Sequence, residues 1–556
     1  MSITHRFRLL PAIVVLALLL LPVAGIAAAP LRASAQDGAT PTVLEAGDEP
    51  AVATPSGEQV LRITGTTEPI ATLDPALARD ATAGFLARQV FRGLTRLDPD
   101  MTPQPELAER IEIDPTGTRY RFTLREDAAF HDGTPILAED VVASLTRALD
   151  PDTAGGDVAR IGGPTYLSDI KGAADVIANR TDVLTGATVI DDRTLELELQ
   201  RPRATFLMKL ASPPAAVVDT AQVAADPDWW RAPNGSGPFR VAELVPDERL
   251  VLAPFENYAA GAPVLQRVEI RLGPSAINSF NLYQADQIDV TGVPLSSLDR
   301  VLDPTSGLDS ELSVEPVLST SFIAFRTDVE PTDDPAIRRA IALAFPREQL
   351  AGVSFQGRKL PASGILPPGL MGRDWPIDGP GYDLDAARAA LAESRYESVE
   401  DIPPIQVFGV GPFGAETLRD TVGESLGLRF EVIDSDWPTF AADLTRQTLP
   451  AYELLWIADF PDPETFLWSL FDSESPDNYS GYSNPVYDEL LDEAAATLDE
   501  DARAARYDDA HQLLLADGAV LPILHDIRYT LIKPEVRGLA VTPLGIMDLD
   551  DVWLEH

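Results

Sequence analysis

Cysteine is absent from the 556 residues, and histidine is scarce, with five copies that stand far apart. The lack of cysteine excludes disulfides, thiolate metal ligands and thiol nucleophiles. The histidines form no H-x-x-x-H or H-x-x-E-H pair, so a catalytic zinc site has little support. No lysine combines a preceding glycine-rich loop with a following Ser or Thr, so a P-loop is absent as well. We therefore expect no bound metal and no ATPase site.

Positive charge is also in short supply, because 43 Lys and Arg stand against 87 Asp and Glu, for a formal net charge of -44. Such a surface repels phosphate backbones and anionic lipid headgroups, so we expect no nucleic-acid partner. Solubility is the plain interpretation of the charge, and a weak attraction for cationic ligands is the other. The 45% share of hydrophobic residues is ordinary for a globular chain of more than one domain.

Long apolar runs are missing except near the N-terminus. Arg6 and Arg8 precede an apolar stretch over 9–21, and Ala33-Ser34-Ala35 offers an A-x-A cleavage site. This pattern predicts a secretory signal peptide over 1–35, with an uncleaved membrane anchor as the alternative. A lipid anchor is excluded without cysteine, and no later segment has 18 consecutive apolar residues. We expect export to the periplasm or the cell exterior, with membrane tethering if the signal peptide is not cleaved.

Residues 36–57 are small, acidic and rich in Pro, Gly and Thr, so we expect a disordered leader there. From Glu58 on, strand and helix patterns alternate, which predicts an α/β fold. Strands are predicted at 59–65, 118–125, 194–200, 249–255, 267–273, 322–328, 404–410 and 428–434. Helices are predicted at 138–149, 335–345, 385–394, 415–426 and 484–498. Asp385 and Asn484 stand where helix N-caps are expected.

Two motifs are typical of enzymes but stand in the wrong context. Gly409 to Gly414 reads G-x-G-x-x-G after a predicted strand, and Asp434 ends the next strand, as in a dinucleotide site. However, Pro412 removes one amide from the phosphate-facing turn, and a plain β-loop-α-β unit is favoured. Gly423 to Gly427 reads G-x-S-x-G around Ser425, but here a helix precedes the serine and a strand follows, the reverse of a nucleophile elbow. We expect no catalytic residue and no cofactor, with a secreted serine hydrolase as a much less favoured alternative.

Several segments together resemble the extracellular solute-binding protein family 5, the oligopeptide- and dipeptide-binding proteins of ABC importers. The most specific segment is 103–151, where P-x-L-A-E, a Tyr-x-Phe-x-Leu-Arg strand and F-x-D-G-T-P precede a helix. Further matches follow in family order at 191–202, 235–258, 322–350, 456–471 and 482–539. Within the first segment, His131 is expected to be a satisfied structural histidine, and Leu137 replaces the Thr that usually caps the helix.

The resemblance implies a two-lobed periplasmic-binding-protein-like fold of the class II type, whose lobes close over a ligand. Lobe I is expected at 58–315 with a return segment at 523–556, including an extra subdomain at about 84–185, and lobe II at 316–522. The implied function is that of a monomeric substrate-binding protein that captures a short peptide and delivers it to the permease of an ABC importer. An oligosaccharide, a nickel chelate or an opine is the alternative ligand.

The resemblance also implies which residues contact the ligand. A family segment, W-x-x-D-x-x-x-P, maps onto Trp456 to Pro463, so Asp459 is expected to bind the α-ammonium group of a peptide held by strand addition. Trp456 and Trp437 are expected to line the pocket as aromatic walls. Alternatively, both pack in the core of lobe II. A turn cap is the alternative role for Asp459. The expected contacts from lobe I are Arg79, Asp80, Ala81 and His525.

Two further acidic residues have different expectations. Asp462 precedes Pro463 and is expected to cap a helix rather than to bind a ligand. Glu453 stands where some oligopeptide-binding members carry an Arg that meets the ligand's carboxylate. Recognition of a ligand carboxylate by this chain therefore needs another cation.

Overall fold

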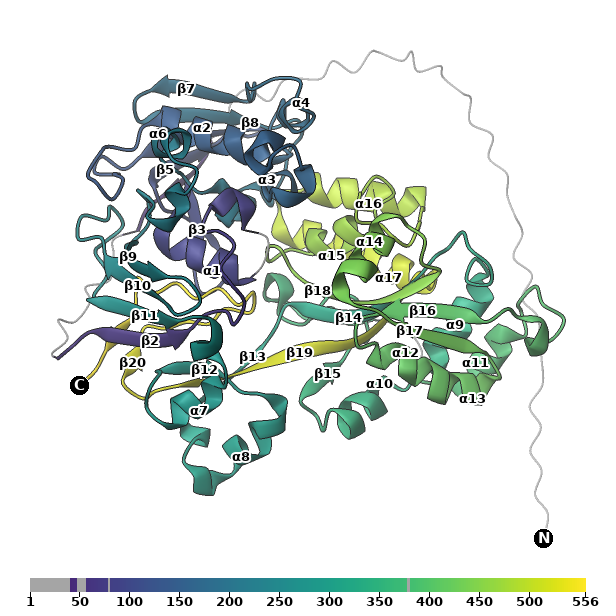
Figure 1. Cartoon of the computed structure of the whole chain (residues 1–556). Helices are drawn as coiled ribbons and strands as arrows, with labels where there is room; N and C mark the ends of the chain where they lie inside the picture. The colour runs from purple at the N-terminus through teal and green to yellow at the C-terminus, as the bar shows by residue number, and fades with distance from the viewer. Residues whose placement is uncertain (1–40, 48–56, 79–80, 378–380) are drawn as a thin grey trace, which may run out of the picture. The chain divides into compact units, whose positions relative to one another are not determined.

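The structure is a computed structural model and describes residues 41–47, 57–78, 81–377 and 381–556 (Figure 1). The predicted signal peptide at 1–35 and the predicted ligand contacts Arg79 and Asp80 lie outside these residues. Within the described part of the chain, no helix combines the length and the apolar character needed to cross a bilayer. Lobe I denotes the predicted ranges 58–315 and 523–556, and lobe II denotes 316–522.

A five-stranded antiparallel sheet in the order β1-β5-β6-β8-β7 carries the first core. Its strands are β1 (Thr42–Glu45), β5 (Ala108–Ile113), β6 (Arg119–Leu124), β7 (Ala187–Asp191) and β8 (Thr194–Glu198). Tyr120, Phe122 and Leu124 alternate along β6 and are buried, as the period of a strand requires. They share a core with Val141 and Leu145 of helix α2 (Ala138–Leu149). Because β7 and β8 belong to this sheet, it extends beyond the predicted end of the extra subdomain at about residue 185.

Strand β1 lies inside the segment expected to be a disordered leader, so that expectation is wrong for Thr42–Glu45. The segment pairs with the edge strand β5 from Thr42↔Ile113 to Glu45↔Arg110. An ion pair of 2.5 Å between Arg110 Nη1 and Glu45 Oε1 adds to the backbone hydrogen bonds. The open edge of β5 supplies hydrogen-bond partners that the composition of residues 42–45 does not reveal.

A second, four-stranded sheet has the order β2-β11-β10-β9. Its strands are β2 (Val60–Thr64), β9 (Phe239–Val245), β10 (Arg249–Pro254) and β11 (Arg267–Arg271). Its core includes Val536, Leu549, Val552 and Leu554 from the end of the chain. The C-terminal segment therefore packs on the first strands of lobe I. Two small ladders complete this region: β3 (Thr95–Leu97) with β4 (Pro103–Pro105), and β20 (Val536–Arg537) with β21 (Trp553–Leu554).

The third sheet has eight strands, with β12-β19-β14-β18-β16-β17 as its main path and β13 and β15 also paired to β19. The strands are β12 (Val290–Gly292), β13 (Leu312–Pro316), β14 (Ser319–Phe325), β15 (Lys359–Pro361), β16 (Ile405–Gly409), β17 (Phe430–Asp434), β18 (Ala451–Ile457) and β19 (Val520–Ile532). The long strand β19 begins beside β14 and ends beside β12 and β13 (Figure 1). It therefore links lobe II to the return segment of lobe I.

The helices cover these sheets and mostly confirm the predicted ones. They are α1 (Ala81–Val90), α2 (Ala138–Leu149), α3 (Gly163–Leu167), α4 (Ala173–Ile177), α5 (Phe206–Leu210), α6 (Thr220–Ala225), α7 (Ser279–Gln284), α8 (Leu298–Leu302), α9 (Pro335–Ala344), α10 (Arg347–Gln349), α11 (Leu384–Leu391), α12 (Phe413–Thr417), α13 (Gly423–Leu426), α14 (Trp437–Thr445), α15 (Glu464–Phe471), α16 (Pro485–Ala496) and α17 (Glu500–Ala516). The predicted strands also occur, and β14 shows the largest shift, since 322–328 was expected.

The helix ends confirm one predicted N-cap and correct another. Asn484 caps α16 as predicted, and its side chain accepts the Val486 N–H at 3.1 Å. Asp385 is not a cap, because Asp383 accepts the first free amides of α11 instead. Leu137 has no capping oxygen, but Asp140 Oδ2 accepts the Leu137 N–H at 2.8 Å and supplies half of a capping box.

Candidate functional site: a hollow lined by both lobes

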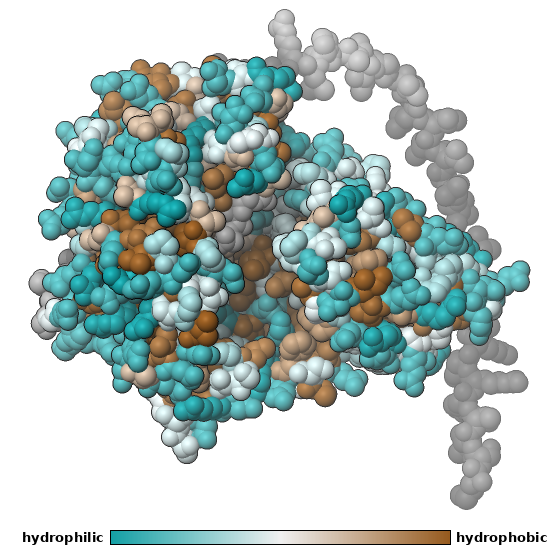
Figure 2. All heavy atoms as spheres, in the orientation of Figure 1, coloured by the Kyte–Doolittle hydropathy of each residue, from teal (hydrophilic) through white to brown (hydrophobic). Residues whose placement is uncertain are grey.

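A hollow of about 340 Å³ takes its lining from both predicted lobes. Lobe I contributes one face of α1, residues around α3, and the chain segment 544–547; lobe II contributes Ile457, Ala458 and Asp459. The face of the molecule in Figure 2 is hollowed between the two lobes. A concave site between two bodies that can move against each other is the usual place for a small ligand.

Helix α1 presents one side to the hollow and the other to the core. Ala81, Gly84, Phe85 and Arg88 line the hollow, and their spacing of three or four residues puts them on one helical face. Leu86, Ala87 and Val90 on the other side are buried in the core of the second sheet. The helix therefore holds the Arg88 side chain at the hollow from a packed support.

Asp459 enters the hollow because β18 ends at Ile457, just before it. The neighbouring Ala458 N–H donates to Leu318 O at 2.8 Å, which ties the turn to the core of lobe II. Thr465 Oγ1 accepts the Asp459 N–H at 2.9 Å and lies 3.0 Å from Asp459 Oδ2, to which it donates. The first turn of α15 thus fixes the direction of the Asp459 carboxylate.

The same loop is held by a second carboxylate. Asp462 is fully buried, accepts the Glu464 N–H at 3.0 Å, and lies 3.3 Å from Arg503 Nε on α17. It therefore stabilises the start of α15 as a structural residue, although the N-cap position is held by Pro463 and not by Asp462 as predicted. Burial raises the pKa of Asp462, and the Arg503 guanidinium opposes that rise.

A buried ion network joins this loop to lobe I. Glu464 Oε1 lies 2.7 Å from Lys209 Nζ, and Thr205 Oγ1 donates to Glu464 Oε2 at 2.9 Å. Lys209 also pairs with Asp169 at 2.8 Å, as does Arg203. Burial alone would raise the pKa of Asp169, but Lys209 and Arg203 hold it below its usual value. The loop with Asp459 is thereby placed relative to lobe I.

The chain segment 544–547 is a part of the site that sequence reasoning missed. Gly545 has φ of 79° and its N–H donates to Thr542 O at 2.7 Å, while Ile546 N–H donates to Thr542 Oγ1 at 3.1 Å. This turn brings Leu544 to Met547 to the hollow. The residues Pro543-Leu544-Gly545 are typical of a turn, but they do not show which distant segments the turn will contact.

The residues predicted to contact the ligand separate into two groups. Ala81 and Asp459 line the hollow. Trp456 is half-buried against the lobe II core, and Trp437 starts α14 and is 57% exposed. His525 is buried, with Nδ1 2.9 Å from Thr320 Oγ1, and burial lowers its pKa to about 4. These last three do not line this hollow, and their roles as ligand contacts stay predictions.

Glu453 points away from the hollow, into the start of α12. Its Oε1 accepts the Gly414 N–H at 3.0 Å and its Oε2 accepts the Ala415 N–H at 2.8 Å. Burial raises the Glu453 pKa to about 7, although the two amides oppose the rise. In addition, Asp434 Oδ1 accepts the Gly411 N–H at 2.9 Å. The carboxylates of Glu453 and Asp434 therefore already bond the amides of the G-x-G-x-x-G motif that a phosphate would need.

Two other motif residues have the local structure that was expected. Ser425 lies inside α13, Gly427 ends that helix with φ of 75°, and strand β17 follows. The helix-then-strand order is the reverse of a nucleophile elbow. The His131 ring is held by Gly235, whose N–H donates to Nδ1 at 3.1 Å, and by Gly237 O, 3.0 Å from Nε2. His131 is therefore a satisfied structural histidine that donates through Nε2.

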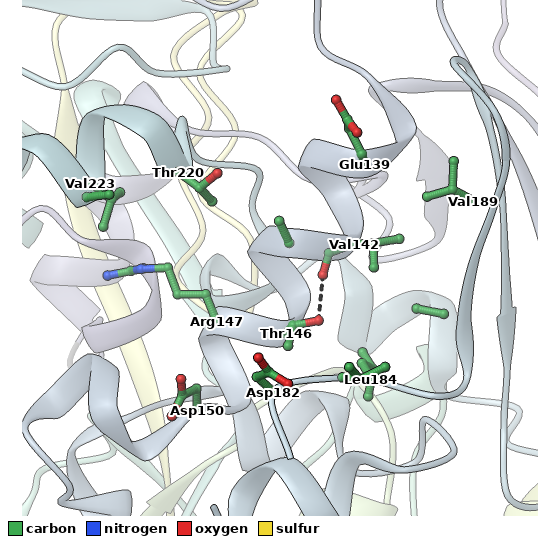
Figure 3. Close-up of a pocket in the computed structure, with 14 residues that line it drawn as sticks. Glu139, Val142, Thr146, Arg147, Asp150, Asp182, Leu184, Val189, Thr220 and Val223 are labelled. Carbon is green, nitrogen blue, oxygen red and sulfur yellow. Dashed lines mark hydrogen bonds between the residues drawn. The ribbon is translucent and has the colours of Figure 1, made fainter.

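A larger hollow of about 580 Å³ lies within the first sheet's region, between α2, β7 and α6 (Figure 3). Most residues that line it are aliphatic, and the Thr146 hydroxyl donates a hydrogen bond to Val142 O at 2.8 Å. Arg147 forms an ion pair with Asp74, with Nη1 2.9 Å from Oδ1. Since all its walls come from lobe I, closure of the two lobes would not enclose a ligand there. Among the described residues no cluster of three or more metal-ligating side chains occurs.

The model of the bacterial extracellular solute-binding proteins, family 5, matches residues 102–478 of this chain. The chain is 29% identical to the probable deoxycholate-binding periplasmic protein YgiS of Escherichia coli K12, over 90% of this chain and 94% of that protein. It is 26% identical to the periplasmic oligopeptide-binding protein OppA of the same organism, over 89% and 92%.

Two solved structures share the fold. The murein tripeptide-binding protein MppA of Escherichia coli has a TM-score of 0.73 at 24% identity, covering 90% of this chain and 99% of that one. OppA of Haemophilus influenzae in complex with the peptide RPPGFSPFR has a TM-score of 0.71 at 21% identity, covering 90% and 100%. The predicted two-lobed α/β fold is confirmed by these similarities.

Proposed function

Because the chain belongs to the bacterial extracellular solute-binding proteins of family 5, we propose that it is the substrate-binding protein of an ABC importer and that its ligand is a short peptide. The observation that carries the peptide assignment is the Asp459 carboxylate in the wall of a hollow shared by both lobes. The ligand's α-ammonium group pairs with this carboxylate when the lobes close. A charge-assisted hydrogen bond of this kind is strong in a cleft that excludes water.

The names of the relatives leave several ligand classes open, since they include binders of oligopeptides, deoxycholate and haem. Deoxycholate and haem carry carboxylate groups and no ammonium group. Asp459 repels such groups and attracts the end of a peptide, so it favours the peptide over those two ligands. An oligosaccharide receptor that stacks sugars on Trp437 and Trp456 is the other candidate, but neither tryptophan lines the hollow.

The remaining steps follow from this role. The protein acts outside the cytoplasmic membrane as a monomer and releases the peptide to a membrane permease after docking. It performs no chemistry on the ligand, and its family consists of receptors rather than enzymes. Peptide capture by main-chain pairing is nearly independent of side-chain identity, so ligand length and end groups dominate selection.

The test begins with native mass spectrometry of gently purified protein, followed by denaturation of the same sample. We expect a released mass that sequences as a peptide, because a tightly held ligand dissociates slowly. A released bile acid, porphyrin or sugar would contradict the peptide assignment. If no mass is released, thermal-shift screening with di- to pentapeptides decides, and the absence of any shift contradicts it as well.

Substitution of Asp459 by Asn then tests the anchor. We expect Asp459→Asn to weaken binding of a free peptide at least tenfold in calorimetry, and N-acetylation of the peptide to do the same in the unmodified protein. Glu424→Gln is the control, because Glu424 is an exposed lobe II acid outside the hollow. Equal affinity of the free and acetylated peptides would remove Asp459 from this role.

A further inference from the structure

Two charged side chains line the 340 Å³ hollow within the described part of the chain, Asp459 and Arg88. They come from different lobes, since Arg88 lies on α1 and Asp459 follows β18. Every other described lining residue is apolar, glycine, threonine or tyrosine. The hollow therefore offers one anionic and one cationic contact, as a zwitterion requires.

The Arg88 guanidinium is available for a ligand. Its Nη1 donates to Ala211 O at 3.0 Å, and it forms no ion pair with any described residue. The nearby carboxylates form ion pairs with Arg92 instead. Its guanidinium nitrogens lie 3.1 Å from Asp548 Oδ1, 3.0 Å from Asp550 Oδ1 and 3.3 Å from Glu106 Oε1. Arg88 thus keeps N–H donors that no other described residue uses.

Electrostatics agree with this geometry. Burial lowers the pKa of Arg88, and Asp548 offsets only part of the loss. A half-buried guanidinium without its own carboxylate gains from an incoming anion, and its fork matches a carboxylate in a bidentate arrangement.

The size of the hollow limits the ligand. The hollow is half open in this structure; if closure of the lobes encloses its volume of about 340 Å³ as a round cavity, that cavity is roughly 9 Å across, and an extended chain advances about 3.5 Å per residue. Two or three residues therefore span it with both ends inside. A longer peptide would place its carboxylate beyond the hollow.

We propose that Arg88 binds the C-terminal carboxylate of the ligand while Asp459 binds its α-ammonium group, so that the protein selects zwitterionic peptides of two or three residues. This inference rests on the proposed function. It also accounts for Glu453, which stands where some relatives carry an arginine: Glu453 is bonded to the Gly414 and Ala415 amides and does not line the hollow. The cation that replaces that arginine comes from lobe I.

The arrangement couples recognition to closure. One end of the peptide binds lobe I through Arg88 and the other binds lobe II through Asp459, so the peptide itself links the lobes. A ligand that lacks its C-terminal carboxylate brings no anion to the half-buried Arg88 guanidinium, which forms no ion pair with the described residues, and this costs free energy on closure. Selection by end groups follows without any contact to the ligand's side chains.

The experiment compares four probes by calorimetry: trialanine, its C-terminal amide, its N-acetyl form, and pentaalanine. We expect trialanine to bind the unmodified protein, and each of the other probes to bind at least tenfold more weakly. In Arg88→Gln, we expect trialanine to lose at least tenfold in affinity and the amide to bind as it does to the unmodified protein. Arg231→Gln is the control, since it also removes one positive charge from an exposed site in lobe I.

The outcomes separate the two proposals. If trialanine and its amide bind equally well to the unmodified protein, the role of Arg88 is overturned while the peptide receptor stands. If pentaalanine binds more tightly than trialanine, the length assignment is overturned. If no probe binds and no peptide is recovered from purified protein, the proposed function itself fails. The amide comparison uses the unmodified protein, so it decides the question even if Arg88→Gln does not fold.

Discussion

The buried carboxyl of Glu453 predicts a pH dependence that one substitution removes. Burial raises its pKa from 4.5 to about 7 in the folded protein, while the unfolded chain keeps the ordinary value. Between these two values the folded state holds a proton that the unfolded state has released. Stability from this group is therefore present at low pH and is lost as pH rises through about 7.

The size of the effect follows from the two pKa values. Proton binding by the folded state at pH 5 favours it by about 2.5 kcal/mol relative to pH 8, where Glu453 is ionised in both states. A Gln at this position cannot titrate. Its carbonyl oxygen can accept one of the Gly414 and Ala415 N–H groups, which now share two carboxyl oxygens.

The assay is urea unfolding of the unmodified protein and of Glu453→Gln at pH 5 and pH 8. We expect the variant to be more stable relative to the unmodified protein at pH 8 than at pH 5, by about 2.5 kcal/mol. Glu424→Gln, an exposed acid of the same lobe, should show no such change. A relative stability of Glu453→Gln that is equal at both pH values would refute a raised pKa and the burial argument behind it.

Two further predictions concern buried groups. Lys209→Met removes the cation shared by Glu464 and Asp169, so we expect the unfolding free energy in chemical denaturation to fall by about 3–5 kcal/mol. Arg249→Met, on the exposed sheet surface, is the control and should change it little. A loss at Lys209 as small as that of the control would contradict a stabilising ion network between the lobes. Burial lowers the His511 pKa to about 3, so the contribution of neutral His511 to folding stability is present above pH 6.5 and is lost as pH falls toward 3. Between pH 6.5 and pH 4, we expect the unfolding free energy of His511→Gln to fall by about 3 kcal/mol less than that of the unmodified protein in the same assay.

Much of the fold could be read from local patterns, because period and turn chemistry are properties of neighbouring residues. The alternation along β6 and the apolar face of α2 predicted those elements within one residue of their observed ends. The cap at Asn484 depends on a side chain next to the helix and was also predicted. Errors arose where a distant partner decided the outcome, as for β1, which exists because β5 offers an open edge.

The candidate site divides in the same way. The sequence by itself determined the α/β alternation, the family to which the chain belongs, and Asp459 as an acidic residue worth testing. Only the tertiary structure decided that Arg88 and the 544–547 turn reach the same hollow, and that Glu453 turns toward the amides of α12 instead. Side-chain period and capping act over a few residues, whereas a binding hollow is made by segments hundreds of residues apart that meet only when both lobes have packed.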